Sequence, residues 1–479
     1  MEEKIFTTEK AEALAAERER VQYEKMVKTP IARLVISLGI PTMLNMMVTS
    51  LYNMADMLFV SGLGDQAIGA VNVVLSLMSI IQAIGFTLGM GAGAIVSRLL
   101  GKRKQKEADE VFSTAFYTAL AIGLVITVVG LAFLGPIMRL FGAIEEAGVP
   151  VTTLEYSKTY STYILLSAPF MCMSFVMNNV LRAQGKAVLS MIGLITGAVL
   201  NVALDPILIY GAKMGMAGAA IATMISQTVS FGILLFIFLS GKTITRIRIK
   251  SVARRFSVYG EILSTGFPSF CRQILASICT VLLNRTIADL GIDGGQAAFG
   301  VVQKVFMLAF SISLGIGQGY QPVLGYNFSA KRYDRVRSAY LFTLWFSVGL
   351  MLAFAIACGL LSGVLMNTFL SSEEARVVGR QTLIFQCLAM PLLPMNFMAG
   401  VTYQVVGGRV AAAFLSCSRQ GLFYIPFIFI LPTAFGVAGL TCLQAVSDVC
   451  AFLFALPFTF AFFKELKRLD REEGLREDK

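Results

Sequence analysis

Long apolar segments constrain the fold of this 479-residue chain more than any other feature. A membrane-spanning helix needs about 20 mainly apolar residues, because the hydrocarbon core of a bilayer is about 30 Å thick. Twelve segments are long enough, and they cover residues 34–60, 67–97, 111–134, 158–181, 187–211, 215–240, 259–288, 296–328, 338–362, 382–407, 411–434 and 437–463. Only 14% of the residues are charged, against about 25% in an ordinary soluble domain. The sequence therefore predicts an all-α membrane protein with twelve transmembrane helices.

The Lys and Arg residues are distributed unevenly between the segments that join these helices. Cytoplasmic loops of membrane proteins are enriched in Lys and Arg. If the N-terminus is cytoplasmic, 31 of the 40 Lys and Arg residues fall on the cytoplasmic side. We therefore interpret the formal net charge of +11 as a topology signal and not as a nucleic-acid binding surface. We expect a multi-pass protein in the lipid bilayer of the plasma membrane, with both termini in the cytoplasm.

Short motifs recur in the two halves of the chain at a nearly constant offset. The pairs are Gly39-Ile40-Pro41-Thr42 with Gly266-Phe267-Pro268-Ser269, Ala70-Val71 with Gly300-Val301, and Lys102-Arg103 with Lys331-Arg332, at offsets of 227, 230 and 229 residues. Each half would hold six helices, an even number, so both halves insert in the same orientation. This repeat predicts two pseudo-symmetric six-helix lobes around a central cavity, an architecture that usually works by alternating access. A duplicated bundle without transport is the alternative.

The repeat also predicts how the chain is divided. We expect an N-terminal cytoplasmic tail at 1–30, an N-lobe at 31–240, a cytoplasmic linker at 241–258, a C-lobe at 259–463 and a C-terminal cytoplasmic tail at 464–479.

Three aspartates lie inside predicted membrane helices, at Asp56, Asp205 and Asp448. A charge near the bilayer centre costs about 3 kcal/mol or more, so such residues are functional candidates by default. The chain has no histidine, so no imidazole can relay a proton or bind a metal, and coupling to a proton requires carboxylates.

Asp205 has a polar neighbour and a helix breaker beside it. Asn201 lies one helical turn earlier on the same face, and Pro206 cannot donate to the carbonyl of Val202, so we expect a kink there. Asn178 and Thr223 add oxygens in the same lobe, although polar helix packing would also explain them.

Polar residues at helical spacing mark two helix faces as candidate walls of a substrate cavity. One face precedes Asp56, and the other follows Arg272 in the seventh helix. The thioethers and the phenol of the tenth helix would suit an amphipathic ligand. The candidates are Asn45, Thr49, Tyr52, Asn53, Arg272, Gln273, Ser277, Asn284, Gln303, Lys304, Met395, Met398 and Tyr403. Asp448 is the expected ion-pair partner of Lys304 or Arg272, in either a structural or a coupling role.

Three motifs together resemble the multidrug and toxic compound extrusion (MATE) family of prokaryotes, most closely its MepA-like group. They are residues 52–64 (YNMADMLFVSGLG), 181–185 (LRAQG) and 201–206 (NVALDP), and the resemblance extends over nearly the whole chain beyond the N-terminal tail. It implies a secondary antiporter, not an enzyme, that exports cationic or amphipathic drugs and needs no cofactor or metal beyond its coupling ion.

The resemblance also implies a site for the coupling cation, formed by Asp56, Asn178, Asn201, Asp205 and Thr223. Two departures bear on it. Thr49 stands where some members carry Gln, and the seventh and tenth helices lack the acids of NorM-like members. The resemblance therefore implies coupling in the N-lobe alone, in a chain that we expect to be a monomer.

The coupling ion and one rival function remain open from the sequence. Two neighbouring carboxylates share protons as a pair, but with amide and hydroxyl oxygens they also form a site for a hard cation such as Na⁺. The rival is a lipid-linked oligosaccharide flippase of the same superfamily, because Arg272 and Lys304 would suit a pyrophosphate. A membrane enzyme would need a catalytic constellation, and none is recognisable.

Overall fold

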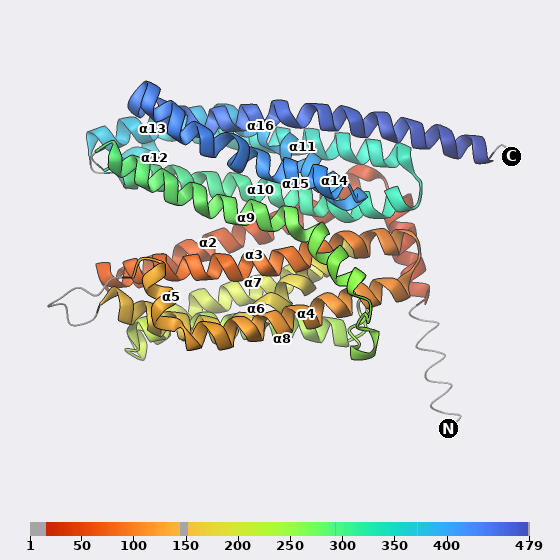
Figure 1. Ribbon diagram of the computed structural model, residues 1–479, viewed down its shortest axis with the longest axis horizontal. Coiled ribbons are helices and arrows are strands. Elements are labelled where there is room, and N and C mark those ends of the chain that lie inside the picture. The colour runs from red at the N-terminus through yellow and green to blue at the C-terminus, as the bar shows by residue number, and fades with distance from the viewer. Residues whose placement is uncertain (1–15, 144–151, 293, 371, 478–479) are drawn as a thin grey trace.

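The computed structural model describes residues 16–143, 152–292, 294–370 and 372–477, and the secondary structure of this part of the chain is helical without a strand. Figure 1 shows the helices as long, roughly parallel rods. After a helical segment at 16–28, the first half comprises α2 (Ile31–Ser61), α3 (Asp65–Gly101), α4 (Gln105–Ala132), α5 (Leu134–Leu140), α6 (Thr153–Ala183), α7 (Ala187–Pro206), the π-helical turn η1 (Ile207–Gly211) and α8 (Gly215–Leu239).

The second half follows a linker that contains the short 3₁₀ turn η2 (Ile249–Ser251). It comprises α9 (Phe256–Asp289), α10 (Gly295–Ser329), α11 (Tyr333–Leu360), α12 (Ser362–Phe369), α13 (Glu373–Ala389), the 3₁₀ turn η3 (Met390–Leu392), α14 (Leu393–Val406), α15 (Arg409–Cys417), the π-helical turn η4 (Ser418–Tyr424) and α16 (Ile425–Glu477).

The number of membrane spans agrees with the prediction of twelve. Among the described residues, eleven helical stretches are long and apolar enough to cross a bilayer, and the last of them is Arg409–Glu473. A straight helix of these 65 residues would be about 98 Å long, roughly three times the hydrocarbon thickness. Gly436 interrupts it with φ of 58° and ψ of −133°, a conformation that is accessible to glycine. The stretch therefore contains two spans.

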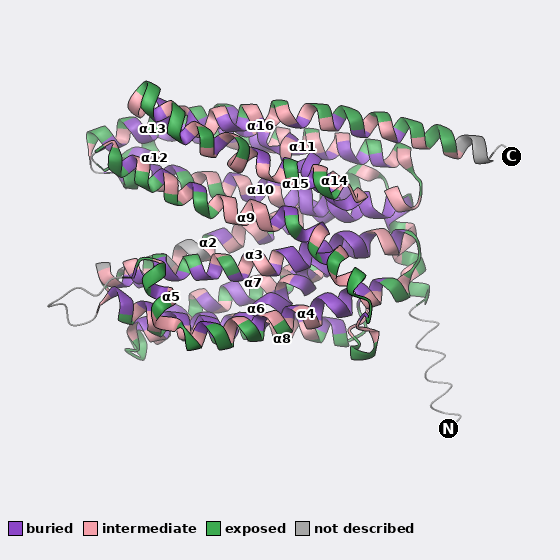
Figure 2. Ribbon diagram, in the orientation of Figure 1, coloured by how far each residue is buried: buried purple, intermediate pink, exposed green. Residues whose placement is uncertain are grey.

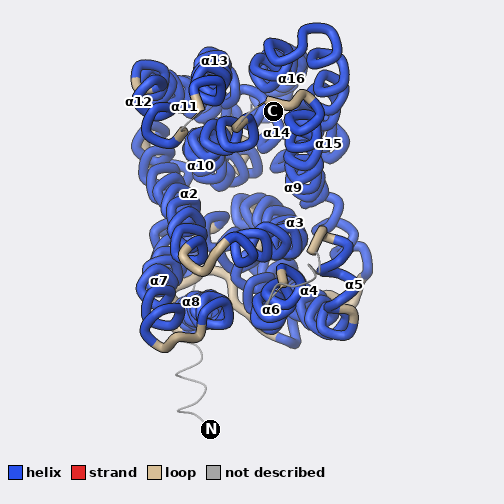
Figure 3. The backbone as a smooth tube through the Cα atoms, turned by 90° about the vertical axis from the view of Figure 1, so that its left-hand side faces the viewer, coloured by secondary structure: helices blue, strands red, loops and turns tan. Residues whose placement is uncertain are grey.

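The two halves of the chain form two lobes, which Figure 3 shows end on. Helices α3 to α8 lie in one group and α9 to α16 in the other. A short helix follows the third span of each lobe, at α5 and again 228 residues later at α12. This correspondence agrees with the internal repeat found in the sequence.

The lobes contact each other through two equivalent helix pairs, α2 with α10 and α3 with α9. Glycines allow the backbones to approach closely. A Cβ at Gly266 of α9 would overlap the carbonyl oxygen of Thr87 in α3, and a Cβ at Gly319 of α10 would overlap the Cα of Gly39 in α2. Gly39 and Gly266 are the first residues of the repeated motif, so the repeat places the same close contact on both sides of the lobe interface.

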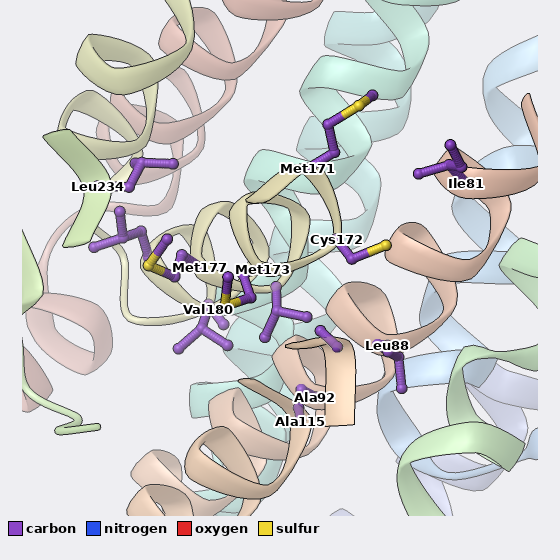
Figure 4. Close-up of a cluster of buried hydrophobic side chains, with 14 of the residues drawn as sticks. Ile81, Leu88, Ala92, Ala115, Met171, Cys172, Met173, Met177, Val180 and Leu234 are labelled. Carbon is purple, nitrogen blue, oxygen red and sulfur yellow. The ribbon is translucent and has the colours of Figure 1, made fainter. Parts of the chain in front are cut away.

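Helix α6 forms the centre of the N-lobe and packs against α3, α4 and α8. Figure 4 shows Met177 and Val180 of α6 between Leu88 of α3, Ala115 of α4 and Leu234 of α8. Figure 2 shows that buried residues concentrate along α6 and along the part of α10 that faces the other lobe. This rigid core positions the polar side chains that α6 contributes to the site described below.

The segments predicted to be cytoplasmic gather at one end of the molecule (Figure 1). Arg18, from the helical segment at 16–28, donates to the carbonyl of Gly241 in the linker. Asn327 donates to the carbonyl of Met26 at 3.1 Å, and Lys331 forms an ion pair with Glu473 at 2.7 Å. The shared end is consistent with the predicted topology, and the side of the membrane on which it lies stays a prediction.

Candidate functional site

Asp56 of α2 and Asp205 of α7 lie together in the N-lobe, as the sequence predicted for two acids in one cluster. They belong to one polar cluster, because Tyr160 contacts Asp56 and Asn201 contacts Asp205. Two neighbouring carboxylates repel each other unless one of them holds a proton. Two adjacent acids that share a proton titrate as a pair. The arrangement is therefore suited to binding and releasing a proton.

Polar groups from α6, α7 and α8 complete a ring around the two acids. Tyr160 Oη of α6 donates to Asp56 Oδ2 at 3.3 Å and lies 3.4 Å from Thr223 Oγ1 of α8. Asn201 Nδ2 lies 3.3 Å from Thr223 Oγ1 and 3.4 Å from Asp205 Oδ1. Asp56 Oδ1, Asp205 Oδ2 and Asn201 Oδ1 are buried and have no donor. Three buried acceptors without donors are costly, and one bound cation would satisfy them.

The local fold beside Asp205 follows from the proline after it. Pro206 ends α7, and the chain continues as the π-helical turn η1, in which the amide of Ala212 bonds the carbonyl of Ile207 at 2.8 Å. Where the sequence predicted a kink, the structure has a π-helical turn, a feature often found at functional sites. Tyr210 of η1 donates to the carbonyl of Phe59 at 2.6 Å, which ties this turn to α2 three residues beyond Asp56.

Asn178 lies away from this ring, contrary to the prediction. It follows Tyr160 by 18 residues in α6, which corresponds to about 27 Å along the helix. Its Oδ1 accepts from Ser190 Oγ at 2.7 Å and its Nδ2 donates to the carbonyl of Ser174 at 3.0 Å. Tyr160 occupies the place expected for it. Sequence reasoning missed Tyr160, although a phenol within a membrane helix also needs a hydrogen-bond partner.

A cavity of about 550 Å³ lies mainly in the C-lobe. Its walls come from α9, α10, α13, η4 and α16, and α3 closes it from the N-lobe with Asn72, Leu75 and Phe86. Four of the predicted cavity residues line it, namely Arg272, Gln273, Gln303 and Lys304. Arg272 and Gln273 are consecutive residues at the centre of α9, and Gln303 and Lys304 are consecutive residues in the first half of α10.

The other candidates in the C-lobe do not line this cavity. Ser277 and Asn284 are exposed and do not line the cavity. Their spacing from Gln273 brings them close to the face of α9 that lines the cavity, but not onto it. Met395 and Met398 are buried in the helical core, and Tyr403 donates to the carbonyl of Phe458 at 2.9 Å. These side chains pack the C-lobe and are not cavity walls.

The candidates of α2 also lie outside this cavity. Asn45 is buried, and neither of its side-chain polar atoms has a partner. Thr49 donates to the carbonyl of Asn45 at 2.9 Å, and Tyr52 hydrogen-bonds Gln227 beside Asp56. The side chain of Asn53 lies outside the described residues. Helix α2 therefore contributes side chains beside the acid pair and not to the cavity, whereas α3 supplies the N-lobe wall of the cavity.

The predicted pairing of Asp448 with Lys304 or Arg272 is wrong. Asp448 of α16 accepts from Arg419 Nε at 2.6 Å and from Gln444 Nε2 at 2.9 Å. Arg419 lies in the π-helical turn η4 and also stacks over Phe306, 4.7 Å from the ring centroid. Sequence reasoning missed Arg419, although it is the only charged residue inside the predicted helix 411–434.

Replacing Arg419 with Met is expected to destabilise the protein by about 3–5 kcal/mol, because Asp448 would remain buried without its counter-ion. The double substitution Arg419→Met with Asp448→Leu should recover much of that loss, since it removes both charges. Thermal unfolding of the purified protein in a neutral detergent measures both effects, with Arg285→Gln on exposed α9 surface as control. Equal stability of the single and double variants would contradict this assignment.

Twelve apolar helices in two lobes, a pair of acids in one lobe and a cavity in the other define a polytopic membrane transporter. The MatE family model matches residues 41–207 and again 268–430, and the second match begins 227 residues after the first, the offset of the sequence repeat. The chain belongs to the MatE family, whose members are transporters and not enzymes.

Individual relatives agree with this membership. Multidrug export protein MepA of Staphylococcus aureus is 27% identical over 431 residues, which cover 88% of this chain and 92% of that protein. A solved structure of a multidrug resistance MATE transporter of the MOP superfamily in an outward-facing conformation is 25% identical with a TM-score of 0.87, covering 93% of this chain and 98% of that one. A MOP superfamily transporter from Pyrococcus furiosus, described as having a binding pocket of reverse polarity, is 26% identical with a TM-score of 0.85, covering 92% and 98%. The chain is therefore a transporter of the multidrug export type.

Proposed function

We propose that this protein is a cation-coupled antiporter that exports amphipathic compounds by alternating access. The observation that carries the proposal is the polar ring that holds both Asp56 and Asp205, together with the three buried oxygens that lack donors. The pair binds the coupling cation, and the C-lobe cavity binds the exported compound. We further propose that the chain works as a monomer in the plasma membrane with both termini in the cytoplasm.

The geometry of the pair favours a proton over Na⁺ as the coupling ion. A proton needs only the two neighbouring carboxyl groups. A metal ion would require several more oxygen ligands. The ring offers Asn201 Oδ1 as a further unpartnered oxygen, which keeps Na⁺ as the alternative.

A cycle of two steps links the two sites. Proton uptake from the outer side satisfies the acceptors of the ring, and α2 then bends near Gly39 and Pro41, which lie where it contacts α10. The bend changes the lobe interface and releases the bound compound outside. Proton release to the cytoplasm restores the starting state, in which the cavity binds a new molecule.

Transport by the purified protein in liposomes tests the proposal and the identity of the ion. An imposed pH gradient in sodium-free medium is expected to drive accumulation of an amphipathic fluorescent dye, and a sodium gradient at constant pH is not. A protonophore should abolish the pH-driven accumulation. Accumulation that needs a sodium gradient would contradict the proton assignment, and accumulation that ignores both gradients would contradict antiport.

One observation favours a second function, a flippase for lipid-linked oligosaccharides. Arg272 and Lys304 line the cavity, and neither has an acidic partner among the described residues. A pyrophosphate would neutralise both charges. The flippase is supported if the same liposomes translocate a polyprenyl pyrophosphate without any ion gradient, and a drug-sensitive host expressing the chain would then gain no resistance to amphipathic dyes.

A further inference from the structure

The charges on the wall of the C-lobe cavity are of one sign. Arg272, Lys304 and Arg419 line it, and none of the described residues that line it is Asp or Glu. Asp448 neutralises Arg419 through a contact of 2.6 Å. Arg272 and Lys304 remain without an acidic partner, so the wall carries an excess of two positive charges.

The position of Arg272 leaves its charge available to a ligand. Its guanidinium stacks over Phe397, 5.3 Å from the ring centroid, a contact that holds the side chain without neutralising it. Lys304 is exposed to the cavity from α10. A cation in a membrane protein is costly without a counter-charge, and a bound anion would supply one.

The rest of the wall is apolar and aromatic, with amide groups among the rings. Phe86, Phe299 and Phe306 come from both lobes, and Gln386 and Gln444 add side-chain amides. A flat or aliphatic body would pack on the rings, and the volume of about 550 Å³ falls within the usual range for small-molecule sites.

We propose that this cavity binds amphipathic organic anions, with a carboxylate, sulfonate or phosphate head at Arg272 and Lys304 and an apolar body against the phenylalanines. The inference rests on the proposed role of the cavity as the export site, and it names the substrate class. An organic cation would meet two uncompensated positive charges and no carboxylate there. The expectation of cationic substrates that came from the family resemblance does not fit this wall.

Two xanthene dyes that share a ring system but differ in charge provide the test. Fluorescence anisotropy of fluorescein, an anion, and rhodamine 123, a cation, measures their affinities for the purified full-length protein in a neutral detergent. We expect fluorescein to bind at least about tenfold more tightly, which corresponds to about 1.4 kcal/mol. Equal binding of the two dyes, or tighter binding of rhodamine 123, would overturn the proposal.

Substitutions test whether Arg272 and Lys304 cause the preference for the anionic dye. The double variant Arg272→Gln with Lys304→Gln is expected to bind fluorescein at least about tenfold more weakly and to lose the preference between the dyes. Arg272→Lys, which keeps the charge, should retain the preference, and this variant distinguishes lost charge from lost packing. Arg285→Gln, on the same helix but outside the cavity, is the matched control. An unchanged preference in the double variant would overturn the assignment of the anion to these residues.

The same anionic head can belong to a lipid or to a free compound, and competition separates these sources. Bound fluorescein is challenged with dodecyl phosphate in detergent and with phosphatidic acid in nanodiscs. Displacement by dodecyl phosphate supports a free amphipathic anion, and displacement by phosphatidic acid alone supports a lipid headgroup. If neither compound displaces the dye, the proposal fails.

The binding assay is independent of ion coupling. The preference between the two dyes is measured without an ion gradient, so it reports on the cavity and not on the acid pair. If gradient-driven transport is absent but the dye preference is intact, the proposed coupling is contradicted and the inference on the cavity stands. If gradient-driven transport occurs without a preference for anions, only the inference on the cavity is contradicted.

Discussion

Replacing Asp56 with Asn is expected to abolish gradient-driven transport while leaving the protein folded. The amide oxygen of Asn can still accept the hydrogen bond from Tyr160, but an amide cannot gain or lose a proton near neutral pH. One pH unit across the membrane is worth about 1.4 kcal/mol per proton, which supports up to about tenfold accumulation at one proton per molecule. The variant should show none, measured as dye accumulation in liposomes.

The partner acid and a distant acid complete this test. Asp205→Asn should fail in the same way, because both acids belong to the proposed coupling site. Asp289→Asn, at the exposed end of α9, should transport as the native protein does. Normal accumulation by the Asp56 or Asp205 variant would remove the pair from the coupling mechanism.

Replacing Gly266 with Ala is expected to disturb the closed contact between the lobes. The added Cβ would overlap the carbonyl oxygen of Thr87, and such overpacking costs about 1–3 kcal/mol. A shift of 1.4 kcal/mol changes a two-state ratio about tenfold, so the balance between conformations moves away from the state described here. Both the thermal unfolding temperature and the rate of dye transport should fall.

The control for this substitution lies on the same helix. Gly260→Ala adds the same methyl group where no atom lies within 4 Å, and it should gain up to about 1 kcal/mol from helix propensity. Gly319→Ala, which meets Gly39 in the equivalent contact, should resemble Gly266→Ala. If Gly266→Ala unfolds and transports like Gly260→Ala, the close glycine contact has no role in the cycle.

An ion cluster lies beside this contact. Glu261 of α9 pairs with Arg98 of α3 at 3.3 Å and with Arg409 at the start of α15 at 3.5 Å. These side chains are partly exposed, so each pair contributes little stability on its own. The cluster connects the two lobes, because Arg98 belongs to one lobe and Glu261 to the other.

Most of the fold could be predicted because membrane helices are specified locally. The length of each apolar segment sets a span, and the predicted segment 187–211 coincides with α7 and η1 together. The repeat was visible because both lobes retain the same glycine and proline at their first helix. The acids Asp56 and Asp205 were found because a carboxylate in an apolar segment is rare and costly.

Partners across helices could not be predicted in the same way. Asn178 and Tyr160 lie in one helix, and only the packing of α6 against α8 and of α2 against α7 decides which of them meets Asp56. The sequence offered Lys304 and Arg272 as partners of Asp448, but the π-helical turn η4 places Arg419 in contact with it. Because Asp448 pairs with Arg419, Arg272 and Lys304 have no acidic partner in the described part of the chain. Their positive charges are the reason for proposing an anionic ligand.

The sequence by itself determined the class of the protein, its twelve spans, its duplication and the two acids of the N-lobe. Each of these follows from the cost of placing polar groups in hydrocarbon, which acts on every segment separately. Only the tertiary structure decided which polar groups meet, because a hydrogen bond depends on the rotation and register of two packed helices. That arrangement brings the two acids into one cluster and leaves the cavity with positive charges that have no acidic partner among the described residues.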